Sequence, residues 1–306
     1  MTKWTLEDVQ RLKGLDLVKF LLSKGILKEP STCPGCGKEG MRVEYSEGGE
    51  GRFRCRGRKC RRSVGLREGS VFEGTRISLE KMMLLVLFWA NGVPFVSIER
   101  LLDVDHKTEE SFRMGLAMRM QGEVEKLRVG GPGLIVEVDE MEFGRKKKGQ
   151  FGKEADPKIF IWGCVCRETG GMVLVPYQKL DREGCGNRFG PSSKDEVLPF
   201  VEKFVVKGSR VFSDGLRAYR DNLVGMGYPG SECVSHKEGE YVKEVSGGVL
   251  CHTNTIDGMW GHVKGHLRFH HFPSPAWMEI AVYELGWRKN FCNDDAFEAF
   301  LDLCSR

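Results

Sequence analysis

Long hydrophobic runs are missing from this sequence. The longest apolar segment covers residues 82–90, whereas a helix that crosses a bilayer needs about 20 apolar residues. The first residues are polar and lack the apolar stretch of a secretory signal peptide. We therefore expect a soluble intracellular protein without a membrane partner, nuclear in a eukaryotic host or cytoplasmic, at the nucleoid, in a bacterial one.

Low-complexity tracts and a large excess of one charge are also missing. Hydrophobic residues make up 41% of the 306 residues and the net charge is only +4. A chain of this length has enough apolar material for two or three folded domains. The composition therefore disfavours long disordered segments and the function classes that require a strongly acidic protein.

Positive charge is nevertheless concentrated in two places. Residues 52–67 contain eight Arg or Lys residues and no acid, and a second basic run follows Gly144. Such clusters favour a nucleic-acid partner, with a solvated basic surface as the alternative. The residues of these runs that we expect to bind DNA are Arg52, Arg54, Arg56, Arg58, Lys59, Arg61, Arg62, Arg145, Lys146, Lys147 and Lys148.

Eleven cysteines stand out in a chain that shows no secretion signal. In a reducing compartment, clustered cysteines are more often metal ligands than disulfide partners. Two close pairs, Cys33 with Cys36 and Cys55 with Cys60, suit a tetrahedral Zn²⁺ site. No βαβ pattern surrounds them, as a redox CxxC motif would require. The spacing predicts a structural zinc ribbon over residues 31–70.

Helical periodicity surrounds this cysteine segment. It predicts a helix within residues 5–28, in an N-terminal segment 1–30, and a helical region over residues 71–129. Two helices in that region, separated by a short turn before His106, resemble a helix-turn-helix whose second helix enters a major groove. Lys107 and Arg113 are its expected DNA contacts. A helical hairpin used for packing or dimerisation has the same pattern.

Strands dominate after a Gly-Gly-Pro-Gly segment at residues 130–133, which is typical of a linker. Apolar segments predict strands at 134–139, 158–167, 172–177, 210–214 and near 233–235, with helices at 193–206 and from about 216. Further helices are expected near 254–268, 275–291 and 294–304. The order predicts an α/β domain with a mixed sheet over residues 134–275, followed by C-terminal helices over 276–306.

Three aspartates occupy the ends of these elements. Asp139 and Asp214 each end a predicted strand, and Asp257 lies near the start of a predicted helix. Acids at the ends of adjacent strands meet at the mouth of a sheet, and a third acid from a helix would complete an oxygen cage for Mg²⁺ or Mn²⁺. Two such ions support in-line attack on a phosphodiester. Taken singly, each aspartate is also explained as a turn former or a helix-start charge.

These motifs resemble the transposases of the Merlin superfamily and their bacterial insertion-sequence relatives, over nearly the whole chain. The shared stretches are residues 138–144, 213–219 and 252–264. The resemblance implies an RNase H-like catalytic domain of the DDE type, in which Asp139 and Asp214 are the first two magnesium ligands. Asp257 stands where the family usually has Glu.

Further site residues follow from the same resemblance. Some bacterial relatives use an Asn and a Lys in the last motif, which makes Asn254 and Lys264 secondary candidates. His252 and Glu140 are two more. Lys264 and Arg268, on the predicted helix that carries Asp257, are expected to reach DNA phosphates.

The implied function is that of a cut-and-paste DNA transposase with structural Zn²⁺ and two catalytic Mg²⁺ or Mn²⁺ ions. Its partners would be the double-stranded terminal inverted repeats of the transposon and the target DNA, bound by a homodimer or a larger synaptic complex. The alternative is a domesticated, catalytically weak or inactive DNA-binding descendant. A metal-dependent nuclease such as a resolvase is a third possibility.

Overall fold

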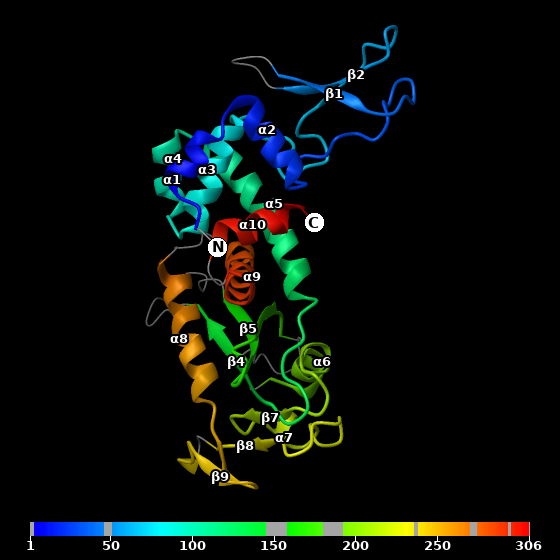
Figure 1. Cartoon of the computed structure of the whole chain (residues 1–306). Helices are drawn as coiled ribbons and strands as arrows, with labels where there is room; N and C mark the ends of the chain where they lie inside the picture. Colours follow the sequence, from blue (N-terminus) through cyan, green and yellow to red (C-terminus); the bar gives the residue numbers. More distant parts are fainter. Residues whose placement is uncertain are drawn as a thin grey trace, which may run out of the picture. The chain divides into compact units, whose positions relative to one another are not determined.

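A computed structural model describes residues 3–45, 51–144, 158–179, 192–235, 238–269, 274–292 and 295–305. The chain forms two compact units, residues 1–119 together with 291–306, and residues 120–290 (Figure 1). The predicted DNA contacts Arg145, Lys146, Lys147 and Lys148 lie outside the described residues. Over the described part of the chain, no helix is long and apolar enough to cross a membrane.

The first unit is mainly helical and carries one small sheet. Its helices are α1 (Leu6–Arg11), α2 (Gly14–Ser23), α3 (Leu79–Ala90), α4 (Phe95–Leu102), most of α5 (His106–Val124) and α10 (Ala296–Ser305). Its three-stranded antiparallel sheet has the order β1-β2-β3, formed by β1 (Met41–Glu44), β2 (Arg52–Cys55) and β3 (Ser63–Gly65).

The helix that the sequence predicts within residues 5–28 is divided into α1 and α2. Thr5 caps α1, since its side chain accepts a hydrogen bond from the Asp8 amide while the Asp8 carboxylate accepts one from the Thr5 amide. The helix is interrupted by Leu12 and Lys13, which are extended, and Gly14 at the start of α2 has a left-handed φ of +53°.

The C-terminal helix α10 completes the core of the first unit. The ring of Phe300 lies 5.5 Å from that of Trp89 on α3 and 5.9 Å from that of Phe112 on α5. Residues 276–306, which the sequence predicts as one C-terminal segment, are therefore divided. Helix α9 (Pro275–Phe291) belongs almost entirely to the second unit, and α10 to the first.

The second unit contains the predicted mixed sheet, with the strand order β6-β5-β4-β7-β8. Strands β4, β5 and β6 are antiparallel neighbours, whereas β7 is parallel to β4, and β8 to β7. The strands are β4 (Ile135–Phe143), β5 (Ile159–Cys166), β6 (Met172–Tyr177), β7 (Arg210–Ser213) and β8 (Glu232–Cys233). The first strand of the unit thus lies in the middle of the sheet.

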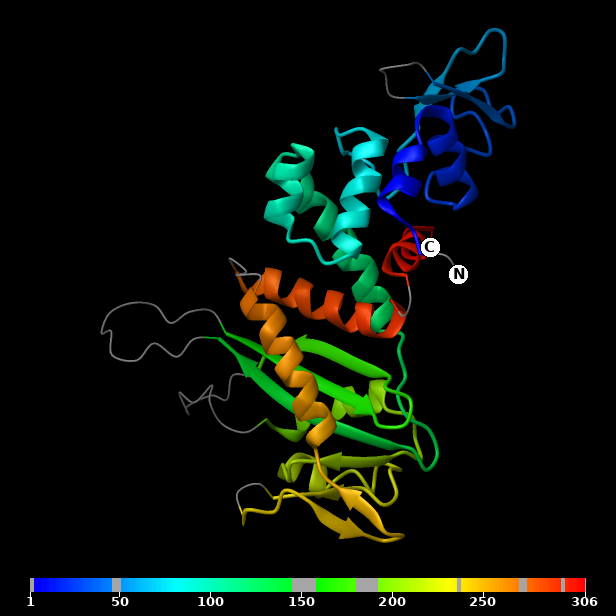
Figure 2. The ribbon, with the colours of Figure 1, turned by 60° about the vertical axis from the view of Figure 1, so that its left-hand side comes forward.

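Helices cover both faces of this sheet. Helix α8 (Asn254–Phe269) and α9 lie across one face, as Figure 2 shows. Apolar side chains of both helices form one buried cluster with the sheet residues Met141, Ile161 and Leu174. On the other face, the ring of Trp162 stacks on Phe200 and Phe204 of α6 (Lys194–Phe204).

Three segments differ from the prediction. The expected linker at residues 130–133 is an ordered turn, in which the Gly131 amide donates a 3.0 Å hydrogen bond to the Ser209 hydroxyl. The helix expected from residue 216 is only one turn, α7 (Arg217–Arg220). A short hairpin of β9 (Lys243–Val245) and β10 (Val249–Cys251), which the sequence reasoning missed, precedes α8.

Candidate active site and cysteine cluster

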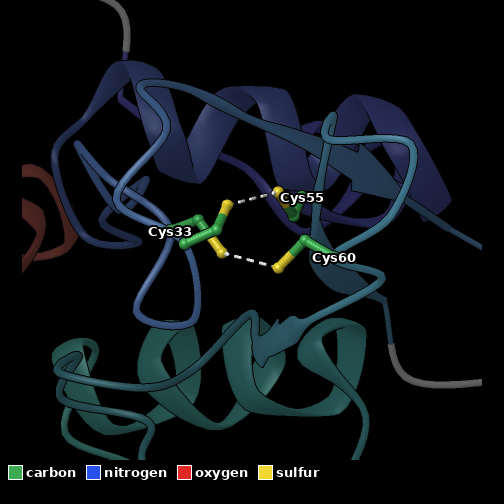
Figure 3. A group of neighbouring side chains, drawn as sticks. Cys33, Cys55 and Cys60 are labelled. Atoms are coloured by element: carbon green, nitrogen blue, oxygen red, sulfur yellow. Dashed lines mark hydrogen bonds between the residues drawn. The ribbon is translucent and has the colours of Figure 1, made fainter.

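The four predicted zinc ligands come together in the first unit. The Sγ atoms of Cys33, Cys36, Cys55 and Cys60 all lie within 4.8 Å of one another. Cys33 and Cys60 are 3.6 Å apart at their sulfurs, and Cys36 and Cys55 are 3.5 Å apart (Figure 3). Four thiolates around one Zn²⁺ at about 2.3 Å would have sulfurs about 3.8 Å apart. The geometry fits a tetrahedral metal ion.

Backbone amides support this cluster. The Gly35 amide donates to Cys33 Sγ, and the Gly57 amide to Cys55 Sγ. The Gly35 amide is also the main reason that the pKa of Cys33 is lowered to about 7, with smaller contributions from neighbouring groups. Both cysteine pairs therefore lie in turns whose amides point at the sulfurs, as expected for thiolate ligands.

The basic residues around the second cysteine pair fall into two groups. Arg52 and Arg54 form ion pairs with Glu44, at 3.3 and 3.1 Å. Arg56, Arg58 and Arg61 are exposed and form no ion pair with any described residue. Arginines of both groups line an open pocket of about 550 Å³. Lys59 and Arg62 are exposed nearby in the sequence.

The predicted helix-turn-helix contains a polar cluster that joins its two helices. His106 Nδ1 lies 2.7 Å from Glu99 Oε1 and 3.8 Å from Glu109 Oε2. Lys107 is exposed, as a DNA contact must be. Arg113 is different, because it pairs with Glu109, stacks 4.3 Å from the Phe95 ring centre and keeps only 15% of its side chain exposed. It is therefore not available for the DNA contact that the sequence predicts.

The strand that the sequence predicts to end at Asp139 continues to Phe143, so Asp139 lies inside β4, where the sheet register sets it beside Asp214. Glu137 on β4 is aligned with Phe212 on the parallel strand β7. Continuing this register by two residues sets Asp214, just beyond the end of β7, beside Asp139. Aligned residues on neighbouring strands point to the same face, which here is the face covered by α8.

Electrostatics indicate that Asp257 belongs to the same group. The pKa of Asp139 is raised to about 7, mainly by burial. The negative charge of Asp214 raises it further and that of Asp257 contributes in the same direction, while a hydrogen bond from Trp260 opposes these effects. Asp214 and Asp257 are themselves exposed. Asp214 and Asp257 thus both lie close enough to Asp139 for their charges to act on it, and a bound cation would relieve this repulsion.

The carboxylates do not form a closed ligand set. Among the described residues, only the four cysteines and the cluster of Glu99, His106 and Glu109 have ligand atoms that all lie within 4.8 Å. One oxygen of Asp139 is engaged, since Trp260 Nε1 donates a 2.7 Å hydrogen bond to its Oδ2. Gly163 makes room for this indole, because a Cβ atom there would lie 2.5 Å from the Trp260 ring.

Helix α8 presents its other candidate residues from the same motif. The Thr253 hydroxyl donates a 3.2 Å hydrogen bond to Asp257 Oδ2, and Asn254 is exposed at the first position of the helix. Lys264, about two turns beyond Asp257, is partly exposed, and Arg268, about three turns beyond it, is exposed. These side chains are therefore accessible on the surface of α8.

Glu140 directly follows Asp139, and, besides burial, the charges of Asp139 and Asp214 help to raise its pKa, but its side chain lies on the other face of the sheet. Successive residues of a strand point to opposite faces, so Glu140 faces away from α8. It accepts a hydrogen bond from the Tyr219 hydroxyl, which itself accepts one from Trp162 Nε1 at 3.1 Å. Burial raises the pKa of Glu140 to about 8. The side chain belongs to a buried network on the α6 face of the sheet.

The sequence reasoning missed Glu137, the most buried carboxylate of this region. Its side chain is fully buried, pairs with Arg167 Nε at 2.5 Å and accepts hydrogen bonds from the Thr255 hydroxyl and the Ile256 amide. His252, a secondary candidate, belongs to the same network. Burial and the nearby Arg167 charge lower its pKa, so its neutral ring accepts at Nδ1 from Arg167 Nη2. For Glu137, the only signal in the sequence was a charged residue within an otherwise apolar strand.

Comparison with known proteins assigns the second unit to a family. A search of curated proteins found no match to the chain. The family model described as ISXO2-like transposase domain matches residues 132–290, just over half of the chain. The matched segment contains all three aspartates and the whole five-stranded sheet. The chain belongs to the insertion-sequence transposase family defined by the ISXO2-like transposase domain.

Proposed function

We propose that the protein is a DNA transposase of the DDE type, in which Asp139, Asp214 and Asp257 hold the catalytic metal ions. The observation that carries this proposal is the convergence of three carboxylates from the middle of β4, from just beyond the end of β7 and from helix α8. They are close enough for Asp214 and Asp257 to raise the pKa of Asp139. Hard oxygen ligands of this kind fit Mg²⁺ or Mn²⁺.

An RNase H-like catalytic fold is part of the proposal. It is supported by three antiparallel strands followed by two parallel ones, with the first strand central in the order β6-β5-β4-β7-β8. An assignment to the Merlin superfamily rests on the motifs of residues 138–144, 213–219 and 252–264.

The residues of the chain have distinct roles in this mechanism. Asp139 and Asp214 are fixed by the parallel register of β4 and β7, and Asp257 is supplied by α8. Bound metal ions would activate the attacking water or 3′-hydroxyl and stabilise the leaving oxygen in both cleavage and joining. Trp260 orients Asp139 through its 2.7 Å hydrogen bond. Lys264 and Arg268 bind phosphates of the DNA backbone, with Asn254 near the same end of α8 as Asp257.

DNA is bound mainly by the zinc ribbon, with Zn²⁺ on the four cysteines. Arg56, Arg58 and Arg61, which are exposed and form no ion pair with a described residue, are the strongest phosphate contacts on this surface, and Lys59, Arg62 and Lys107 add to them. Two transposon ends have to be held together during transposition, so we expect a dimer or larger assembly to be the active form.

Cleavage and joining assays test the proposal. Purified protein is incubated with labelled transposon-end DNA and either Mg²⁺ or Mn²⁺. We expect cleavage and strand transfer that fall at least about a thousandfold in Asp139→Asn and Asp214→Asn. Asp221→Asn is the matched control, because Asp221 is an exposed aspartate beyond α7 that pairs only with Arg220 among the described residues. Its activity should equal that of the wild type.

A catalytically inactive, domesticated DNA-binding protein is the second candidate. It is favoured by two observations, the shorter Asp257 in the usual place of Glu and the open arrangement of the three carboxylates. Specific binding of transposon-end DNA without cleavage under either metal would establish this alternative and refute the enzyme. If the enzyme is correct, Asp257→Glu retains or increases cleavage, and Asp257→Ala abolishes it.

A further inference from the structure

We propose that Glu137 and Arg167 form a clamp that docks the first turn of α8 on the sheet and thereby sets the position of Asp257 relative to Asp139. The inference rests on the proposed function, in which these two aspartates hold metal ions. Glu137 touches neither DNA nor metal in this scheme. It is a positioning residue, buried beneath the site.

The hydrogen bonds of Glu137 converge on the start of α8. Its Oε2 accepts a 2.9 Å hydrogen bond from the Ile256 amide, and its Oε1 accepts one of 2.8 Å from the Thr255 hydroxyl. The partner of this carboxylate is Arg167, at the end of β5, whose Nε lies 2.5 Å from Oε1. Every polar atom of the Glu137 carboxylate is thus bound to α8 or to Arg167.

Arg167 also binds the segment that enters α8, through hydrogen bonds to two of its carbonyl groups. Its Nη1 donates 2.8 Å to the Leu250 carbonyl on β10, and its Nη2 donates 2.8 Å to the His252 carbonyl. His252 Nδ1 in turn accepts from the Asn254 amide at 3.3 Å. The chain that enters α8 is therefore held at its carbonyls by Arg167, while the first helix amides are held by His252 and Glu137.

The location explains why a charged pair is present in an otherwise apolar layer. A buried ion pair is costly unless all of its hydrogen bonds are made, and here they are made. The first amides of a helix lack partners within the helix and carry partial positive charge, so a carboxylate placed there is favourable. An apolar side chain at position 137 would fill the space but would leave the Ile256 amide without this acceptor.

The clamp and the site share the same two elements. Glu137 and Asp139 are two residues apart on β4 and point to the same face. The clamped amide of Ile256 directly precedes Asp257 on α8. We therefore expect a substitution that loosens the clamp to change the position of Asp257 relative to Asp139, because little structure lies between the clamp and the two aspartates. Groups that orient metal ligands typically affect metal affinity or activity by about 10- to 100-fold when they are removed.

The experiment compares Glu137→Gln with the wild type in the zinc-loaded, full-length protein. The first measurement is amide hydrogen exchange over residues 252–260, which reports the docking of α8 without any need for activity. The second is the Mn²⁺ concentration that gives half-maximal cleavage of transposon-end DNA. We expect faster exchange in this segment and a half-maximal Mn²⁺ concentration about 10- to 100-fold higher.

Two further variants make the test specific. Thr255→Val removes one hydrogen bond to Glu137 from an exposed position and should change both measurements in the same direction, but less. It replaces Glu137→Gln if that variant does not fold. The matched control is Glu196→Gln, since Glu196 is a mostly buried carboxylate that caps α6 instead of α8. It should leave exchange over residues 252–260 and the Mn²⁺ requirement unchanged.

The outcomes separate this inference from the proposed function. Unchanged exchange over residues 252–260 and an unchanged Mn²⁺ requirement in Glu137→Gln would overturn the clamp, as would an equal rise of the requirement in Glu196→Gln. If the wild type cleaves no DNA with any metal, the proposed function fails. The clamp is then judged by hydrogen exchange, together with calorimetric Mn²⁺ affinity, which should fall in Glu137→Gln.

Discussion

Trp260 reaches Asp139 only because residue 163 has no side chain. A Cβ atom on Gly163 would lie 2.5 Å from Cη2 of Trp260 and 3.0 Å from Cε of Met259. We expect Gly163→Ala to displace the indole and to lower the free energy of unfolding by about 1–3 kcal/mol, the usual cost of overpacking a core. Urea unfolding measures this change.

Gly65→Ala is the control for this substitution. Gly65 is also a strand glycine, but a Cβ atom there would meet nothing within 4 Å. The free energy of unfolding of Gly65→Ala should stay within about 0.5 kcal/mol of the wild-type value. Equal stability of Gly163→Ala and the wild type would show that the indole does not rest on Gly163.

The raised pKa of Glu109 predicts that the stability of the first unit depends on pH. Burial raises its pKa from 4.5 to about 7, against the opposing charge of Arg113. A raised pKa means that the folded state binds the proton more tightly than the unfolded state. The stabilisation is thus complete below pH 4.5 and is lost as the pH rises through 7. The hydrogen bond to Glu99 raises the pKa of His106, which acts in the same direction.

The measurement compares wild type with Glu109→Gln between pH 5 and pH 8. We expect the wild type to lose about 1 kcal/mol more than the variant over this range, after allowance for solvent screening, because the amide does not titrate. Thermal unfolding monitored at each pH detects this as a difference of a few degrees. Parallel pH profiles for the two proteins would contradict the prediction.

Single residues also show where sequence reasoning stops. The place of Asp214 was predictable, since an acid that directly follows an apolar strand is a local signal, whereas the strand expected to end at Asp139 continues to Phe143. Glu137 was not predictable, because its partners Arg167 and Ile256 lie 30 and 119 residues away. Arg113 had the charge expected of a DNA contact, but its neighbours Glu109 and Phe95, one turn and one helix away, engage it instead.

At the scale of elements, α8 contains three glycines that its packing does not require. Gly258, Gly261 and Gly265 all lie within it, and a Cβ atom at any of them would meet nothing within 4 Å. Glycine in a helix costs up to about 1 kcal/mol relative to alanine. We therefore expect Gly265→Ala to raise the unfolding free energy of the second unit by about 0.5–1 kcal/mol, measured by urea denaturation. A loss of stability would mean that the backbone at residue 265 is not free to take a side chain.

Elements with a strong period or a clear cap were predicted closely. The helix expected at 275–291 is α9 over the same residues, and the strand expected at 172–177 is β6. The shortest elements were not predictable. Strands β9 and β10 have only three residues each, and their pairing depends on the two left-handed glycines Gly247 and Gly248 between them. Local sequence carries little information about such a hairpin.

At the scale of the molecule, the two units should respond to metals separately. Removal of the ion from the four cysteines by a strong chelator should unfold residues 31–66, because structural zinc supplies much of the folding energy of such small modules. The second unit has its own core and should stay folded. Hydrogen exchange of the whole chain measures both responses in one experiment.

Cys36→Ser should reproduce the effect of the chelator, and Cys233→Ser is the matched control, since Cys233 lies in the second unit outside the cluster. The same treatment should weaken DNA binding and reduce its salt dependence, as the arginines near Cys55 lose their fixed arrangement. Loss of structure in both units on chelation would refute the independence of their folding.

The molecular organisation was only partly predictable. The mixed sheet and the cysteine module follow from local patterns and are confirmed by the structure. The division into units does not follow, because it depends on Phe300 meeting Trp89 from more than 200 residues away. No periodicity within α10 indicates which part of the chain it will join.

The return of α10 to the first unit has a consequence during protein synthesis. Trp4 donates through its Nε1 to Glu298, and Phe297 and Phe300 lie against Trp4 and Trp89. These contacts form only after the last helix has left the ribosome, whereas the second unit is already complete at residue 290. The first unit is therefore completed after the second, and a chain that stops before residue 296 would contain a folded second unit but an unfinished core in the first.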